Sequence, residues 1–323
     1  MRLLRILPLV LLVSRSPARA TATSSLVKRS YITTSGNFAA AAGSCSSSNK
    51  MPEKRVVPVI SSLEDLERKL PGYLNSNAPL ALLLDYDGTL VALANNPANT
   101  LLTANMRKLL HQLAGHPKVF LALISGRGLR DVQSCLGIQG ITYAGNHGLE
   151  IESGDGTRHD YALPAELQTR YTTIVNELTA KLENNGAWVE DKKVSLTFHY
   201  RHVPADSAEQ YRQAAKAIIE SHGFRANQAH MAVEAKPPVN WNKGEAALLI
   251  LKNQFGDDWA KNIKVIFAGD DNTDEDAMRL LQGSGISFRV STDPNIQTYA
   301  DFRLASQGVV EDLLTWISIT YNQ

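Results

Sequence analysis

Residues 80–90 read LALLLDYDGTL, an apolar run of five residues followed by two aspartates that a single tyrosine separates. Such a run is typical of a strand that is buried on both faces, as in a parallel sheet. Alternate residues of an extended chain point the same way, so Asp85 and Asp87 are expected to lie together at the carboxyl end of the sheet, where α/β proteins bind ligands. Two unpaired carboxylates are costly there, which indicates a bound cation or an acid–base task.

The sequence around this strand predicts a doubly wound parallel sheet. A helix with apolar residues at i, i+3, i+4 and i+7 runs through Met106, and buried strands with a second short helix follow before residue 147. The same alternation of helix and strand returns after residue 238. We therefore expect a Rossmann-like α/β core formed by residues 78–147 and 238–318.

The stretch between the two halves of this core has a different pattern. Residues 153–156 read SGDG, which is a hairpin signal, and helical patterns at 166–182 and 208–219 lie among short alternating segments. A connection of this length is too long for a loop inside a compact domain. Residues 148–237 are therefore expected to form an inserted α+β domain.

Residues 1–50 are left out of this fold because their composition is that of a targeting segment. They hold ten serines and seven basic residues but no Asp or Glu, and their apolar run at 6–13 is too short to span a bilayer. We expect a mitochondrial-type leader; a secretory signal and a disordered extension are the alternatives. A start at Met51 would give a shorter, cytoplasmic form.

The charge balance argues against a nucleic-acid partner. Seven of the 33 basic residues lie in the leader, so residues 51–323 carry a net charge of −6. Neutralising phosphates along a duplex needs a basic stripe, which an acidic body does not offer. The two cysteines, Cys45 and Cys135, are too few for a Cys-rich zinc site, and no transmembrane segment is expected.

Three further polar strings fall at the same predicted edge of the sheet. Ser125-Gly126 ends the second strand, Lys243-Gly244 opens the helix after the insertion, and GDDNTDE at 269–275 ends a later strand. Each string alone is common in turns and helix caps. Their arrangement around one sheet edge is what indicates a site.

In order and strand context, these elements resemble the haloacid dehalogenase superfamily of phosphohydrolases, and the place of the insertion resembles that of its larger α/β cap. The resemblance covers roughly residues 78–318 and implies that the inserted domain is a cap that determines substrate specificity. Four strings are moreover similar to those of trehalose-6-phosphate phosphatases: GNHGLE at 145–150, FHYR at 198–201, VEAKP at 233–237 and NKG at 242–244.

The resemblance implies a Mg²⁺-dependent phosphatase that converts trehalose 6-phosphate to trehalose and phosphate, a step of trehalose biosynthesis, through an aspartyl phosphate. Asp85 would attack phosphorus, and Asp87 would protonate the departing sugar oxygen and then activate water. The expected ligands of Mg²⁺ are Asp85, the carbonyl of Asp87 and Asp270, with Asp271 and Asp274 contacting or orienting them. The residues expected to hold the phosphoryl oxygens are Ser125, Gly126 and Lys243.

The resemblance also implies the residues that read the sugar: Glu234, Lys236, Arg201, His147 and Asn146. Glu234 and Lys236 are two residues apart, so they share one face of a strand, although a surface charge pair is the alternative interpretation. A different sugar phosphate, such as sucrose 6-phosphate or a hexose phosphate, stays open as the substrate. A non-catalytic sugar-phosphate sensor and a phosphomutase stay open as other functions, and any trehalose-phosphate synthase partner would be a separate chain.

Overall fold

The computed structural model describes residues 29–32, 52–93 and 101–322. The expected leader therefore lies outside the described residues, with the exception of β1 (Arg29–Ile32). That strand pairs in parallel with β7 (Arg158–Tyr161), so part of the segment that was left out of the fold covers an edge of the main sheet. Within the described ranges, no helix is both long and apolar enough to cross a membrane.

The core of the molecule is a ten-stranded sheet whose centre is parallel, as the sequence predicts. Its strand order is β1-β7-β6-β5-β4-β3-β12-β13-β14-β2, so the two halves of the core meet where β3 pairs with β12. The remaining bounds are β2 (Val59–Ile60), β3 (Leu80–Leu84), β4 (Val119–Ile124), β5 (Thr142–Gly145), β6 (Glu150–Glu152), β12 (Lys264–Gly269), β13 (Ile286–Val290) and β14 (Phe302–Leu304).

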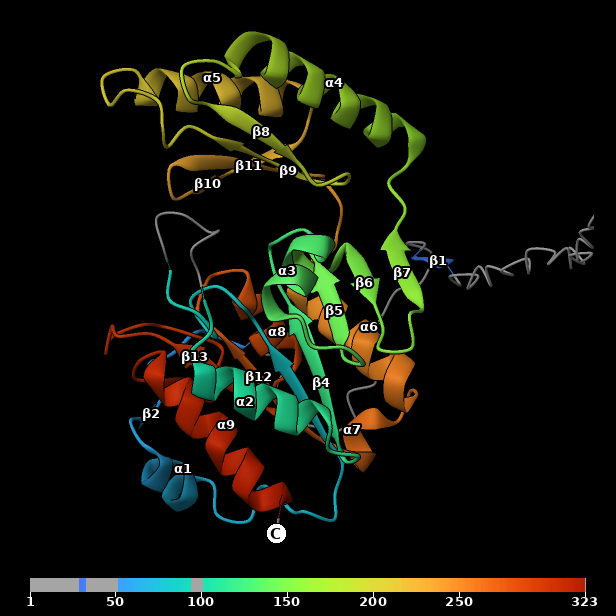
Figure 1. Cartoon of the computed structure of the whole chain (residues 1–323), viewed down its shortest axis with the longest axis vertical. Coiled ribbons are helices and arrows are strands. Elements are labelled where there is room, and N and C mark those ends of the chain that lie inside the picture. The colour runs from blue at the N-terminus through green and yellow to red at the C-terminus, as the bar shows by residue number, and fades with distance from the viewer. Residues whose placement is uncertain (1–28, 33–51, 94–100, 323) are drawn as a thin grey trace, which may run out of the picture.

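Helices cover both faces of this sheet (Figure 1). One face packs against α1 (Leu63–Lys69), α2 (Ala104–Ala114), α3 (Leu129–Leu136) and α9 (Gly308–Tyr321). The other face packs against α6 (Lys243–Phe255), α7 (Trp259–Asn262) and α8 (Asp274–Leu280). The start of α2 follows from its sequence, because the hydroxyl of Thr103 caps it by accepting a hydrogen bond from the Met106 amide at 3.0 Å.

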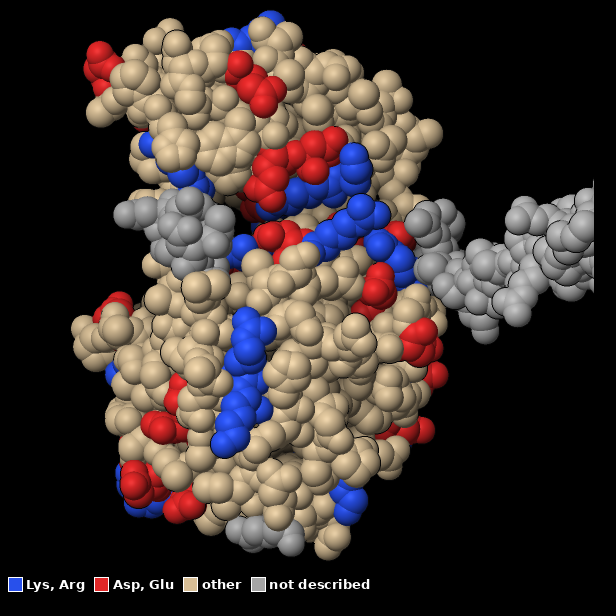
Figure 2. Space-filling view, in the orientation of Figure 1, with Lys and Arg blue, Asp and Glu red and all other residues tan. Residues whose placement is uncertain are grey.

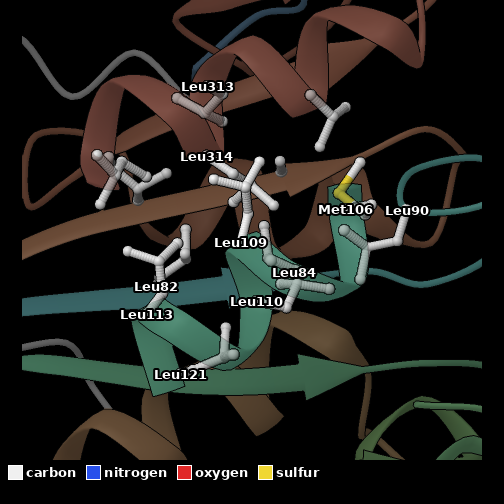
Figure 3. Close-up of a cluster of buried hydrophobic side chains, with 14 of the residues drawn as sticks. Leu82, Leu84, Leu90, Met106, Leu109, Leu110, Leu113, Leu121, Leu313 and Leu314 are labelled. Carbon is white, nitrogen blue, oxygen red and sulfur yellow. The ribbon is translucent and has the colours of Figure 1, made fainter. Parts of the chain in front are cut away.

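Strand β3 explains why an uninterrupted apolar run is needed at the centre of the sheet. Leu82 and Leu84 point into the cluster formed with α2 and α9, which Figure 3 shows, while Ala81 and Leu83 point into the opposite cluster. All of these side chains are fully buried. The sequence pattern therefore predicts the central strand because both of its faces exclude water.

The inserted domain is a second layer, with its own core. Its four-stranded antiparallel sheet has the order β10-β11-β9-β8, and α4 (Ala165–Leu182) and α5 (Ala208–Ser221) cover the face that lies away from the large sheet (Figure 1). We call this layer the cap. Its strands are β8 (Trp188–Asp191), β9 (Leu196–His199), β10 (Arg225–Ala229) and β11 (Ala232–Lys236).

The structure differs from the expected boundary at residue 148. The hairpin of β6 and β7 pairs antiparallel with β5 and extends the main sheet, so it belongs to the core layer. The outer edge of β5 would otherwise leave its backbone groups unpaired, and the hairpin satisfies them. Strand β10 was also not predicted, because its sequence RANQA is mostly exposed and has no apolar alternation.

Candidate active site

The carboxyl ends of the parallel strands bring the expected residues to one edge. Asp85 follows β3, Ser125 follows β4, and Asp270 follows β12, while Lys243 is the first residue of α6. The crevice between this edge and the cap is lined by residues of both layers. Figure 2 shows charged side chains gathered along both of its sides.

Lys243 is a buried lysine at this edge. Its Nζ donates to Oδ1 of Asp85 at 2.7 Å and to Oδ1 of Asp274 at 2.8 Å, and its side chain is 2% exposed. Asn242 caps α6 by accepting from the amides of Gly244 and Glu245, which aims the first turn at the site. A Cβ on Gly244 would lie 2.6 Å from the Asp276 carbonyl oxygen, so glycine permits the close packing of α6 on α8.

The loop after β12 is held by its own carboxylates. Oδ2 of Asp274 accepts from the amides of Asp270 at 3.1 Å and Asp271 at 3.0 Å. Oδ1 of Asp271 accepts from the Thr273 amide at 2.7 Å. Arg289, from β13, donates to the Asp271 carbonyl oxygen, which fixes the loop from behind. Both oxygens of Asp274 therefore have protein donors.

Several aspartates crowd around the single ammonium group of Lys243. Burial raises the pKa of Asp85 to about 7, although Lys243 opposes it. Burial, reinforced by Asp274 and Asp271, likewise raises the pKa of Asp270 to about 7. Burial would also lower the pKa of Lys243, but Asp274 and Asp85 outweigh it and keep that pKa well above its usual value. A second positive charge would relieve this crowding.

The geometry fits a divalent cation. Asp85, Asp270 and Asp274 each offer a carboxylate oxygen, and these oxygens lie within 4.8 Å of one another. The carboxylate of Asp270 rests against the backbone of Gly88: a Cβ there would lie 2.0 Å from Oδ2, and the φ of +82° also favours glycine. Oxygen donors of this kind suit hard cations such as Mg²⁺.

Asp87 is held by Arg127, a contact that sequence reasoning missed. The guanidinium donates to both oxygens of Asp87 at 2.7 Å each and to Asp131 at 3.0 Å, and Arg127 is 8% exposed. Arg127 stands directly after Ser125-Gly126, so its place at the edge was visible. Its pairing with a residue 40 positions away has no local signal.

The cap wall of the crevice carries Glu234, which pairs across the two layers. Its Oε1 lies 3.1 Å from Nε2 of His147 in the core, and its Oε2 lies 3.1 Å from Nζ of Lys236. Burial would raise the pKa of Glu234, but His147 and Lys236 outweigh it and hold that pKa well below its usual range. Burial lowers the pKa of His147, with Glu234 opposing.

The expected site residues do not all reach the crevice. Nine of them line it: Asp85, Asp87, Gly126, His147, Arg201, Glu234, Lys243, Asp270 and Asp271. Ser125 is buried behind this wall, where its hydroxyl accepts from the Arg127 amide at 3.1 Å. Lys236 lines a neighbouring hollow beside Trp241, and Asp274 is fully buried beneath the floor.

Asn146 differs from the other expected sugar contacts because its side chain joins the core to the cap. Oδ1 accepts from the Ser195 hydroxyl at 3.0 Å, and Nδ2 donates to the Lys192 carbonyl at 3.1 Å and to Glu150 at 2.5 Å. The residue is fully buried and has a φ of +52°. These contacts occupy the amide within the protein.

Sequence reasoning also missed cap residues that line the crevice. Glu190 and Lys192 come from the end of β8 and the turn after it, and Nζ of Lys192 donates to the Gly126 carbonyl at 3.2 Å. Glu190 and Lys192 are two residues apart in the sequence, which indicates that their side chains lie on the same face of an extended segment. What the sequence could not reveal is that this turn reaches the core.

The fold is that of haloacid dehalogenase-like hydrolases. A hydrolase of this type from Bacteroides thetaiotaomicron aligns with a TM-score of 0.52 at 15% identity, covering 74% of this chain and 99% of that one. The C-terminal domain of trehalose-6-phosphate phosphatase from C. albicans aligns with a TM-score of 0.65 at 21% identity, covering 81% and 98%. These similarities establish the architecture of core plus cap.

Sequence similarity identifies one family within this class of hydrolases. The "Trehalose-phosphatase" family matches residues 83–307, so the chain belongs to that family of phosphoric monoester hydrolases. "Probable trehalose-phosphate phosphatase C" of Arabidopsis thaliana is 32% identical over 247 residues, covering 73% of this chain and 75% of the relative. "Trehalose-phosphate phosphatase" of Mycobacterium marinum is 30% identical over 239 residues, covering 72% of this chain but 60% of the relative.

Proposed function

We propose that this protein hydrolyses trehalose 6-phosphate to trehalose and phosphate, with Asp85 as the nucleophile. The observation that carries the proposal is the crevice itself: buried Asp85 with Lys243 on its floor, and the contact of Glu234 with His147 at its junction with the cap. The residues of the floor alone could act on any phosphate monoester. The polar side chains on the cap wall favour a substrate with many hydroxyl groups.

The nucleophile is positioned by its partner. Lys243 occupies Oδ1 of Asp85, which leaves Oδ2 to form the bond to phosphorus while the sugar oxygen departs. Hydrolysis of the resulting aspartyl phosphate by water then restores the carboxylate. Dividing the reaction in this way replaces one slow displacement by two easier ones.

Asp87 supplies and removes the proton. In the first step it protonates the leaving sugar oxygen, and in the second it accepts a proton from the attacking water. Arg127 holds both of its oxygens in this structure, so one of them must leave the guanidinium before it can carry that proton. Lys243 and the amide of Gly126 bind the phosphoryl oxygens, and Ser125 supports them from behind the wall.

A divalent cation, most simply Mg²⁺, completes the floor. Asp85, Asp270 and the carbonyl of Asp87 would hold it from the floor of the crevice. Asp274 lies fully buried beneath that floor, and with Asp271 it orients the loop. When bound, the cation neutralises negative charge on the transferring phosphoryl group.

The cap reads the sugar in this proposal. Glu234 and Arg201 line the crevice and offer an acceptor and donors for sugar hydroxyls, and His147 bridges the two layers beside them. Lys236 acts through Glu234, which it contacts. We assign Asn146 to the joint between the layers, because its amide is occupied by Ser195, Lys192 and Glu150.

The test is phosphate release by the full chain from four substrates, with Mg²⁺ and with EDTA, beside an Asp85→Asn variant. The substrates are trehalose 6-phosphate, sucrose 6-phosphate, glucose 6-phosphate and phenyl phosphate. We expect a strong preference for the first, abolished by EDTA and by the substitution. Equal rates on all three sugar phosphates would mean that trehalose 6-phosphate is not the specific substrate. Binding of a sugar phosphate without phosphate release would indicate a sensor.

A further inference from the structure

A line of three polar side chains on the cap leads to the crevice. Nε2 of His199 lies 2.8 Å from Oε2 of Glu190, and Nδ1 of His199 lies 3.0 Å from Nη2 of Arg201. All three residues line the crevice. His199 itself is only 7% exposed, so its ring mainly contacts protein, including its two charged neighbours.

The two neighbours determine which nitrogen of the His199 ring carries the hydrogen. Arginine has no acceptor, so the Nδ1 atom facing Arg201 must offer its lone pair. A carboxylate has no donor, so the Nε2 atom facing Glu190 must carry the hydrogen. The arrangement therefore selects one neutral tautomer of His199, which accepts from the guanidinium and donates to Glu190.

The indole ring of Trp188 packs against both His199 and Arg201. It is the cross-strand neighbour of His199 in the pairing of β8 with β9. The two rings stack with centroids 4.4 Å apart and an interplanar angle of 16°, and Cζ of Arg201 lies over the indole at 5.8 Å. The indole thus contacts both the imidazole and the guanidinium, which limits rotation of either one.

We propose that His199 is a positioning residue that fixes the guanidinium of Arg201 to donate hydrogen bonds to the neutral sugar hydroxyls of the substrate. The inference rests on the proposed function and deepens it. A free arginine side chain loses considerable rotational entropy when it binds a ligand, and one that is already held loses less. The structure offers three contacts that hold it beforehand: the imidazole of His199, the face of Trp188 and, through the ring, Glu190.

Two substitutions of His199 separate its two hydrogen bonds. Asparagine places its amide near the position of Nδ1, so H199N keeps an acceptor for Arg201 and loses the contact with Glu190. Glutamine places its amide near the position of Nε2, so H199Q keeps a donor to Glu190 and loses the acceptor. The two variants are matched in polarity, and the melting temperature of each controls for folding.

We expect H199Q to raise KM for trehalose 6-phosphate about tenfold, with kcat changed less than about twofold, because a hydrogen bond to a charged group is lost. H199N should stay within about threefold of wild type in KM. Neither variant should change kcat/KM for phenyl phosphate, which carries no sugar hydroxyl. Equal losses for the two variants, or a matching loss on phenyl phosphate, would overturn the proposal.

A double-mutant cycle tests whether His199 acts through Arg201. In an R201A background, H199Q should have no further effect on KM, because the group that it positions is gone. A full additional loss there would mean that His199 works independently of Arg201. If wild type hydrolyses no sugar phosphate, the proposed function and this inference fail together; if wild type is active and H199Q is unchanged, the inference alone fails.

Discussion

The two walls of the crevice are built in different ways. On the floor, Asp85, Lys243 and Asp274 are almost fully buried and lie at the ends of strands and helices of the main sheet. On the cap, Glu234 and Arg201 are held by other side chains on the surface of an antiparallel sheet. The floor is fixed by buried ion pairs together with backbone amides that donate to Asp274, whereas the cap wall is fixed by contacts between partly exposed side chains.

This difference suggests a division of labour. Bond-making atoms need positions that hold to a fraction of an ångström, which buried elements of a parallel sheet supply. In the proposed function, recognition of the sugar falls to a separate layer. The predictions below test the contrast between floor and cap, from the largest expected effect to the smallest.

The largest effect is expected from Asp85→Asn on the floor. The variant should lose on the order of 10⁴-fold or more in kcat on every phosphate monoester, because an amide cannot form the aspartyl phosphate. Its melting temperature should not fall, since the substitution removes one charge from a crowded cluster. Phosphate release and thermal unfolding measure the two effects, and residual activity within tenfold of wild type would reject Asp85 as the nucleophile.

The next effect contrasts two lysines, one on the floor and one on the cap. Lys243→Met should cost about 3–5 kcal/mol in the free energy of unfolding, because it leaves Asp85 and Asp274 buried without their partner. Lys236→Met should cost about 1 kcal/mol or less, since the Lys236 side chain is 19% exposed and Glu234 keeps its contact with His147. Urea denaturation of both variants checks this, and similar costs would contradict the contrast between the walls.

Glu234→Ala should impair recognition more than chemistry. We expect kcat/KM for trehalose 6-phosphate to fall about 10- to 100-fold, because a buried charged acceptor for the sugar is lost. The value for phenyl phosphate should change less than about threefold. Steady-state kinetics on the two substrates measures the difference, and equal losses would count against a role in reading the sugar.

The smallest effect concerns the contact between the layers and its dependence on pH. Burial lowers the pKa of His147 below its ordinary value of 6.5, so the folded protein favours the neutral ring. The stability that this ring contributes is complete above pH 6.5 and is lost as the pH falls below that value. The unfolding free energy of His147→Gln should therefore vary less with pH than that of wild type between pH about 6.5 and 5. Parallel slopes in denaturation series would disprove this assignment.

The features of the site that could be predicted are those whose residues lie close together in the sequence. The string at 85–90 and the start of α6 at Lys243 are local features, and the structure has them where the sequence predicts them. The contact of Arg127 with Asp87 and the reach of Lys192 to Gly126 are not local, and they were missed. Strand β10 was missed because it is paired by its backbone and has no apolar face of its own.

The sequence by itself determined the parallel core, the strand ends that carry the acids and the presence of an insertion, because apolar periodicity and the order of strands are written along the chain. Only the tertiary structure decided that the hairpin of β6 and β7 joins the core sheet. It also decided that Asn146 is a joint between the layers and that Lys192 of the cap reaches the Gly126 carbonyl of the core. The physical reason is that a hydrogen bond between distant segments depends on how two layers pack, and no short stretch of sequence contains both of its partners.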